Sequence, residues 1–271
     1  MDTILTLFSY TFILRAITVG ILASLCASLL GVTLVLKRYS MIGDGLSHVS
    51  FGALAVAAAF NAAPLAVSVP IVIAAAFILL RITENSRINA DAAIAVFSSS
   101  SLAIGIIITS MTSGINADVC NYMFGSILAM SSGDVYMSVI LSIFVLVVYF
   151  IFYNRIFAIT FDETFSHATG VNVNIYNMII AVLTAVTIVL GMRIMGALLI
   201  SSLIIFPALT AMRLSDCFKG VIIIAAITGV ICFFIGIIIS YILEIPVGAS
   251  VVVMNLLVFL SALLQKNLKK Y

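Results

Sequence analysis

The residues best suited to chemistry are Asp44 and His48, which lie in the stretch MIGDGLSHVSFG over residues 41–52. Side chains four positions apart on an α-helix share one face, so the carboxylate and the imidazole are expected one turn apart. A carboxylate with a neutral imidazole suits Zn²⁺ or Mn²⁺, whereas Ca²⁺ prefers oxygen ligands alone. The spacing equally allows an Asp44–His48 hydrogen bond that stabilises a polar helix face, and the motif alone leaves both interpretations open.

A complete metal site needs more ligands than one Asp44–His48 pair supplies. A two-fold dimer that brings two copies of the pair together would offer four ligands, enough for a tetrahedral site. The nearby hydroxyls of Ser47 and Ser50 are expected to bond to the helix backbone rather than to a metal. The glycines of the same stretch are expected to permit close contact with a neighbouring helix.

The pair lies in a chain whose composition is that of a membrane protein. Of the 271 residues, 64% are hydrophobic and only 8% are charged, whereas about a quarter of an ordinary soluble domain is charged. So few charges cannot cover a soluble surface, and most of the chain is therefore expected to face lipid. An ionisable side chain within a span costs roughly 2.5–3.5 kcal/mol on insertion scales, which makes Asp44 and His48 functional candidates.

Apolar stretches along the chain are long enough to cross a bilayer as helices, because backbone in lipid must satisfy its own hydrogen bonds. We expect nine spans, near residues 15–36, 42–60, 65–81, 91–111, 135–153, 175–191, 196–213, 220–243 and 248–265. The stretch 121–134 is too short to span and is expected to be interfacial or re-entrant, and a total of eight spans is an alternative. The predicted fold is an all-α, polytopic transmembrane helical bundle that forms a single domain over residues 1–271.

Lysines and arginines are concentrated in alternate connections between these spans. One side of the bundle would carry ten of them, namely Lys37, Arg38, Arg81, Arg87, Arg155, Arg213, Lys219, Lys266, Lys269 and Lys270. The other side would carry Arg193, and Arg15 near the first span is not assigned. The positive-inside rule places the basic side and the C-terminus in the cytoplasm, together with the long polar connection 154–174.

Three further residues in or beside the spans have both a structural and a functional interpretation. Asp91 opens a span, where a carboxylate can cap the helix or act as a gate. Pro207 is expected to kink its span, either as a hinge or for packing. Glu244 in an outer turn is an ordinary loop acid or a contact for an extracytoplasmic partner.

The second histidine, His167, lies in the cytoplasmic connection with Asp162 and Glu163. This polar patch is expected to be either a docking helix for a soluble partner or a solvated connection, and we assign no metal role to His167.

Several catalytic and cofactor motifs are absent from the sequence. There is no GxxxxGK[ST] phosphate-binding loop, so ATP hydrolysis would need a separate subunit. The sequence also shows no Ser-His-Asp set, HExxH or CxxC motif, and we do not expect an enzyme. The four cysteines, at positions 26, 120, 217 and 232, are expected to be free thiols packed in apolar helices.

Several segments, in order along nearly the whole chain, resemble the metal permeases of ATP-binding cassette importers that serve zinc, manganese or iron. Residues 30–55 (LGVTLVLKRYSMIGDGLSHVSFGALA) resemble the family signature L-R-R-x-S-x-x-G-D-A-L-S-H-A, with glycine at position 45 in place of alanine and valine at position 49 in place of a small residue. Other segments that resemble the family are DAAIAVFSSSSLAIGIII (91–108), FGSIL (124–128), FDETFSHATGV (161–171), MGALLISSLIIFPALTAMRL (195–214) and IPVGASVVV (245–253).

The resemblance implies a homodimeric or paired permease in the cytoplasmic membrane. It implies as partners a cytoplasmic ABC ATPase and an extracytoplasmic metal-binding protein, and no nucleic acid is expected. It maps the metal pathway onto Asp44 and His48, and the ATPase-coupling loop onto Asp162, Glu163 and Gly170. No permanently bound cofactor is expected. The transported ion would be Zn²⁺, or alternatively Mn²⁺ or Fe²⁺.

The expected mechanism is alternating access, in which the metal enters an outward-open cavity between two permease copies and leaves inward after ATP-driven closure of the ATPase. One alternative is an ATP-independent transporter or channel that uses the Asp44–His48 pair for proton or ion passage. A non-transport scaffold or an intramembrane enzyme is a further alternative.

Overall fold

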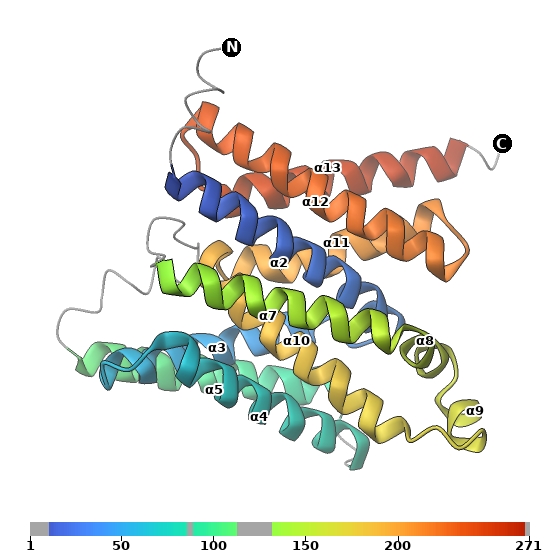
Figure 1. The fold of residues 1–271 in the computed structure, drawn as a ribbon, viewed down its shortest axis with the longest axis horizontal. Helices are drawn as coiled ribbons and strands as arrows, with labels where there is room; N and C mark the ends of the chain where they lie inside the picture. Colours follow the sequence, from blue (N-terminus) through green and yellow to red (C-terminus); the bar gives the residue numbers. More distant parts are fainter. Residues whose placement is uncertain (1–10, 86–88, 113–131, 269–271) are drawn as a thin grey trace.

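The computed structural model describes residues 11–85, 89–112 and 132–268, and every regular element within these ranges is a helix. Figure 1 shows long helices that run back and forth along one direction. The elements are α2 (Thr11–Leu36), α3 (Ile42–Ala59), α4 (Pro64–Asn85), α5 (Ala90–Met111), α7 (Ser132–Ile151), α8 (Tyr153–Phe161), α9 (Glu163–Ala168), α10 (Val173–Met195), α11 (Ala197–Leu214), α12 (Phe218–Leu243) and α13 (Val247–Leu268).

Nine helices in the described ranges are long and apolar enough to cross a membrane, which confirms the predicted spans. Their apolar stretches are Leu14–Leu36, Ile42–Ala59, Pro64–Thr83, Ala90–Met111, Gly133–Ile151, Val173–Met192, Ala197–Leu214, Phe218–Leu243 and Val247–Gln265. The interfacial segment predicted at 121–134 lies mostly outside the described residues.

The connections predicted to be cytoplasmic lie together at one end of the bundle. In Figure 1 this is the right-hand end, where α8 and α9 join α7 to α10, and where the α2–α3 and α11–α12 connections also lie. The fold therefore brings the basic connections to one end, as the lysine and arginine pattern predicts.

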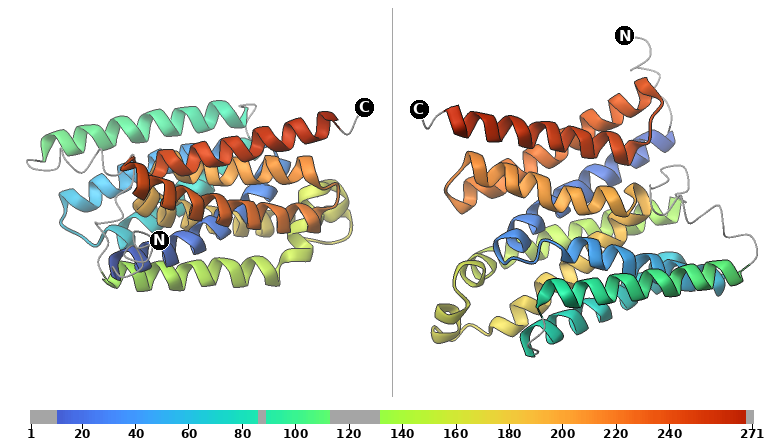
Figure 2. Two further views of the ribbon diagram at one scale, coloured as in Figure 1. Left: turned by 90° about the horizontal axis from the view of Figure 1, so that it is seen from above. Right: turned by 180° about the vertical axis from the view of Figure 1, so that it is seen from behind.

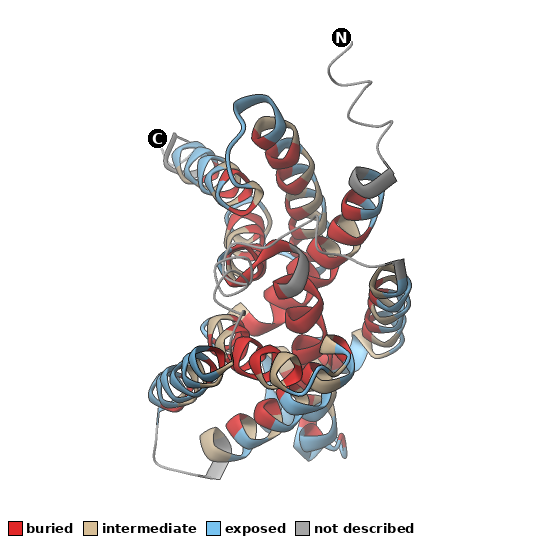
Figure 3. Ribbon diagram, turned by 90° about the vertical axis from the view of Figure 1, so that its left-hand side faces the viewer, coloured by how far each residue is buried: buried red, intermediate tan, exposed pale blue. Residues whose placement is uncertain are grey.

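The helices differ strongly in how much of each is buried. In the most apolar stretch of each helix, 72% of the residues are buried in α2, α3 and α10, but only 22% are buried in α5 and α7. Figure 3 shows the same distribution, with buried residues at the centre and exposed faces outside. Because lipid tails are as apolar as these outer faces, packing between helices rather than exclusion of water holds the bundle together.

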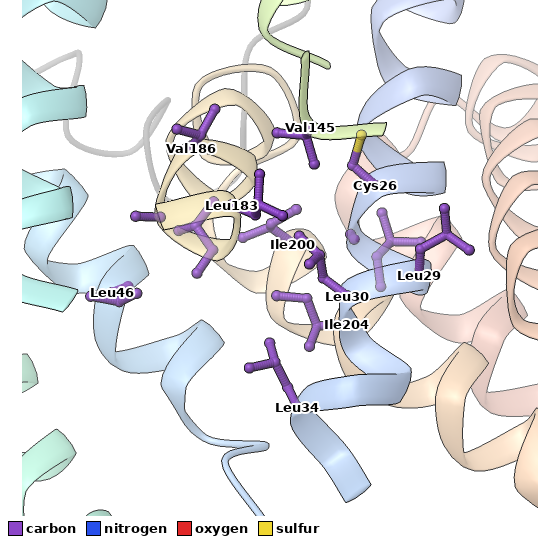
Figure 4. Packing of buried hydrophobic residues seen from close by; sticks show 14 of the residues in the cluster. Cys26, Leu29, Leu30, Leu34, Leu46, Val145, Leu183, Val186, Ile200 and Ile204 are labelled. Carbon is purple, nitrogen blue, oxygen red and sulfur yellow. The ribbon is translucent and has the colours of Figure 1, made fainter. Parts of the chain in front are cut away.

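The centre of the bundle is filled by interlocking branched side chains. Leu29, Leu30 and Leu34 of α2 lie near Ile200 and Ile204 of α11, and Figure 4 shows them with side chains from α3, α7 and α10. All five residues are at most 2% exposed, so their dispersion contacts are close to complete.

The polar connection between α7 and α10 contains two short helices, one of which lies at the predicted docking helix. The helix at the predicted span 135–153 ends at Ile151. The short helix α8 begins at Tyr153 and continues into the predicted connection 154–174, which also contains α9. Pro207 lies inside α11, which continues to Leu214 without a break, and the predicted hinge role stays a prediction. Cys26 and Cys232 are buried free thiols as expected, whereas the expectation is wrong for Cys217, which is exposed in the connection before α12.

Candidate metal site

Asp44 and His48 lie in the first half of α3, which starts on the basic side of the bundle. Asp44 is in the first helical turn, and His48 Nε2 lies 3.7 Å from Asp44 Oδ2. This distance is longer than a hydrogen bond, so the two side chains share a face without a hydrogen bond between them. The side chain of His48 is 21% exposed and that of Asp44 is 45% exposed, so neither is fully buried.

Glycines hold α3 tightly against α5, as the sequence predicts for this segment. A Cβ atom at Gly52 would lie 2.9 Å from the backbone oxygen of Ser101, and one at Gly105 would lie 2.7 Å from Phe51 Cε1. Figure 2 shows the two helices side by side in the view from behind. Close contact between these helices therefore depends on the absence of side chains at the two glycines. This contact holds α5 next to the face of α3 that carries Asp44 and His48.

A pocket of about 430 Å³ opens between α3 and α5 beside Asp44. Its lining combines acidic and hydroxyl side chains with three apolar ones, and consists of Met41, Asp44, Asp91, Ile94, Ala95, Ser98 and Ser99. His48 is not part of the lining, so the pocket and the pair meet at Asp44. The spacing of Asp44 and His48 gave no signal for Asp91, Ser98 or Ser99, because these residues come from another helix.

Asp91 does not cap its helix, which favours a role in the pocket over the predicted cap. Asn89 occupies the N-cap position of α5, and Asp91 follows in the first turn. A carboxylate in the first turn is stabilised by the helix dipole. Its side chain also faces the same pocket as Asp44.

The two serines beside the pair behave differently from each other. Ser47 donates a hydrogen bond to the carbonyl oxygen of Gly43 at 2.7 Å, as expected for a hydroxyl bonded to its own helix. The same expectation is wrong for Ser50, whose buried hydroxyl has no hydrogen-bond partner among the described residues.

The described part of one copy does not assemble a complete metal site. Within the described ranges, no group of three or more His, Cys, Asp or Glu side chains could hold a metal ion. On α5, the exposed residues Ser99 and Ser100 belong to a run of four serines, and Ser99 lines the pocket. Exposed hydroxyls suit water or a second protein surface better than lipid tails.

The residues expected to couple to an ATPase form the short helix α9 and its two ends. Asp162 is the N-cap, and its Oδ1 accepts a hydrogen bond from the backbone N–H of Phe165 at 2.8 Å. Glu163 begins the helix, and its Oε1 lies 2.6 Å from Lys37 Nζ. Gly170 follows the helix with φ of 82°, a conformation that glycine adopts without strain.

The exposed side chains of this end include aromatic rings. Phe161 and Phe165 are 60% and 65% exposed, and the rings of Phe157 and Phe161 pack 5.0 Å apart between centroids. His167 is exposed in the last turn of α9, away from the Asp44–His48 pair. Apolar rings beside polar side chains at the basic end of the bundle give this surface the character of a protein interface.

Membrane proteins of metal transport systems are among the relatives of this chain. A "Probable iron transport system membrane protein" of Haemophilus influenzae is 33% identical over 97% of this chain and 93% of the relative. The "Manganese transport system membrane protein MntC" of Halalkalibacterium halodurans is 28% identical over 91% of this chain and 84% of the relative. The "High-affinity zinc uptake system membrane protein ZnuB" of Haemophilus influenzae is 28% identical over 93% and 97%.

A solved structure shares the fold. The structure described as "PsaBC from Streptococcus pneumoniae in complex with Fab" contains a chain that matches with a TM-score of 0.87 and 28% identity, covering 96% of this chain and 94% of that chain. The family model described as "ABC 3 transport family" matches residues 9–266. This multi-pass membrane protein therefore belongs to the ABC 3 transport family.

Proposed function

We propose that this chain is the permease subunit of an ATP-binding cassette importer that carries a divalent transition metal inward across the cytoplasmic membrane. The observation that carries the proposal is the Asp44–His48 pair, which lies one turn apart beside a polar pocket. The names of relatives in the same family, which include iron, manganese and zinc transport systems, support this class of cargo.

The cargo that we propose first is Zn²⁺. Two copies of the chain would bring two carboxylates and two imidazoles together, and this donor set matches the tetrahedral preference of zinc. Mn²⁺ and Fe²⁺ are the alternatives, since the relatives carry all three metals in their names. The exposed hydroxyls of Ser99, which lines the pocket, and of Ser100 support a second copy or a water-filled path beside α5.

The ATPase would be a separate subunit that binds at α9. The sequence contains no phosphate-binding loop, and α9 presents the exposed ring of Phe165 on the basic end of the bundle. An extracytoplasmic binding protein would deliver the metal at the opposite end. Under this proposal the chain performs no chemistry, and its side chains bind the ion only transiently so that it can leave.

The test is uptake of radioactive zinc, manganese and iron by cells that carry the chain with its ATPase. We expect Asp44→Asn and His48→Gln to abolish uptake of one metal, while Asp216→Asn in the exposed α11–α12 connection keeps it. Each variant must reach the membrane and retain the ATPase. Normal uptake by both pathway variants would remove the pair from the metal pathway.

A second measurement separates this proposal from an ATP-independent transporter. In proteoliposomes that contain the full complex, metal transport should require ATP on the side of the membrane that carries the ATPase. It should persist without a proton gradient. Uptake that follows a proton gradient and ignores ATP would contradict the importer assignment.

A further inference from the structure

The side chain of Lys37 is buried at the cytoplasmic end of the bundle, where it joins three helices. The side chain is only 6% exposed, and the residue comes directly after Leu36, the last residue of α2. Lys37 Nζ lies 2.6 Å from Oε1 of Glu163 in α9 and 2.5 Å from Oδ1 of Asn177 in α10. Asn177 Nδ2 also donates to Glu163 Oε1 at 3.4 Å, so the three side chains form a closed polar cluster.

Because Lys37 is buried, its hydrogen-bond partners cannot be replaced by water. An ammonium group withdrawn from water is tolerated only when it is paired and hydrogen-bonded, so Lys37 requires its partners. Glu163 is itself 52% exposed and is free to reach water if the contact opens. The cluster therefore attaches a surface helix to the bundle through a buried cation.

The chain continues from Lys37 directly into the helix that carries the candidate metal pair. Arg38 has a φ of 62°, and the turn is closed by the backbone N–H of Tyr39, which donates to Leu34 O at 2.8 Å. The N–H of Ile42, the first residue of α3, donates to Tyr39 O at 3.0 Å. Asp44 then lies in the first turn of α3, so a compact, hydrogen-bonded turn separates Lys37 from Asp44.

We propose that Lys37 is a positioning residue, which fixes α9 to the α2–α3 turn and so makes Asp44 respond to movement of α9. The inference rests on the proposed function, because it assumes an ATPase at α9 and a metal at Asp44. A displacement of α9 moves Glu163, and Lys37 must either follow or lose its pairing. If Lys37 follows Glu163, the turn that precedes Asp44 also moves. The Lys37–Glu163 contact therefore links α9 to Asp44 and His48.

The experiment uses the complete complex in proteoliposomes and measures metal uptake and ATP hydrolysis together. We expect Lys37→Gln to hydrolyse ATP while uptake per ATP falls about tenfold, within the range typical of coupling between sites. Lys219→Gln is the matched control, because it removes the same charge at the same end of the bundle from an exposed position. The control should keep the wild-type ratio of uptake to hydrolysis.

A charge exchange distinguishes coupling from a loss of folding. The double variant Lys37→Glu with Glu163→Lys restores an ion pair between the same two positions, and it should recover most of the lost uptake per ATP. A double variant as uncoupled as Lys37→Gln would overturn the proposal, as would a Lys37→Gln protein with the wild-type ratio. If Lys37→Gln does not accumulate, Asn177→Leu decides the matter, because it removes the other partner of Lys37 and should lower the ratio in the same direction.

These outcomes are separate from those that test the proposed function. A wild-type complex that shows no ATP-dependent metal uptake would contradict the importer assignment itself. A wild-type complex that transports metal, beside a Lys37→Gln complex that transports equally well per ATP, would contradict only the role of Lys37.

Discussion

Gly45 of α3 lies directly against Ile94 of α5, so that a Cβ atom at position 45 would come within 2.5 Å of Ile94 Cγ2. The signature that this segment resembles has alanine at the same position. In this chain the branched side chain of Ile94 takes up the space that such a methyl group would need. The two residues are therefore matched to each other across the helix contact that borders the pocket.

Adding one methyl group at this contact should destabilise the protein. We expect Gly45→Ala to cost about 1–3 kcal/mol, since β-branched Ile94 cannot easily rotate away from the added carbon. Thermal unfolding of the detergent-solubilised protein measures the effect. In an Ile94→Ala background, Gly45→Ala should cost much less than it does in the wild type, because the clashing methyl group is gone. A Gly45→Ala protein as stable as the wild type would contradict the close contact.

A different glycine should resist rescue of this kind. A Cβ atom at Gly31 of α2 would lie 2.0 Å from the backbone oxygen of Ile204 in α11. Trimming a side chain cannot move a carbonyl group, so Gly31→Ala should be more damaging than Gly45→Ala. Ile204→Ala should fail to rescue it in the same unfolding assay, and a successful rescue would show that the helices separate easily.

The thiol of Cys217 should be the most reactive of the described cysteines. The backbone N–H of Gly220, at 3.3 Å from Sγ, lowers the pKa of this exposed thiol, and the Ser215 hydroxyl and the Lys219 charge add to the effect. A lowered pKa means more thiolate at any pH below it, so alkylation by iodoacetamide should rise at lower pH than for an ordinary thiol. Cys26 and Cys232 should be protected by burial.

The alkylation measurement needs a background in which Cys120, outside the described residues, is replaced by alanine. Ser215→Ala should shift the pH profile of Cys217 upward, because it removes one of the groups that stabilise the thiolate. If the pH profile of Cys217 alkylation does not change in Ser215→Ala, the lowered pKa of Cys217 would be due to the start of α12 and not to Ser215.

Loss of the cap on α9 should weaken attachment of the ATPase. Asp162→Ala removes the acceptor for the Phe165 N–H and should cost about 1 kcal/mol of helix stability, whereas Asp162→Asn keeps a capping oxygen. We expect less ATPase to co-purify with the alanine variant than with the asparagine variant. Equal recovery with both would mean that the α9 helix is ordered without its cap.

The pocket beside Asp44 should be accessible to water from the cytoplasmic end. In a cysteine-free background, Ser98→Cys should react with a charged, membrane-impermeant thiol reagent, and Zn²⁺ should slow the reaction. Ile107→Cys on the exposed apolar face of the same helix provides the comparison and should react slowly. Protection by zinc that survives Asp44→Asn would contradict a shared site.

The membrane spans could be predicted closely because hydropathy along the chain is a local property. The predicted span 42–60 and the helix Ile42–Ala59 agree almost residue for residue. The helix α9 agrees with the docking-helix alternative for the polar patch at His167, whereas α8 was not predicted because it is short and follows the span directly. Their ends depend on local features, such as the Asp162 cap and the positive φ of Gly170.

The candidate site could be predicted only where its residues lie on one helix. The i,i+4 spacing of Asp44 and His48 shows that they share a face, but nothing in that spacing points to Asp91 on α5. The contact between Lys37 and Glu163 joins residues 126 positions apart, so no local pattern reveals it. The unpaired hydroxyl of Ser50 likewise depends on the helices around it.

The glycine contacts between α3 and α5 restrict which motions can open a path beside the metal pair. Backbone atoms of the two helices approach each other so closely at Gly52 and Ser101 that rotation of either helix about its own axis would drive side chains into the neighbouring backbone. Helices α3 and α5 are therefore expected to tilt together, as one rigid body. Asp44 and Asp91 would travel together in such a tilt, and the pocket between them would keep its shape while its surroundings change.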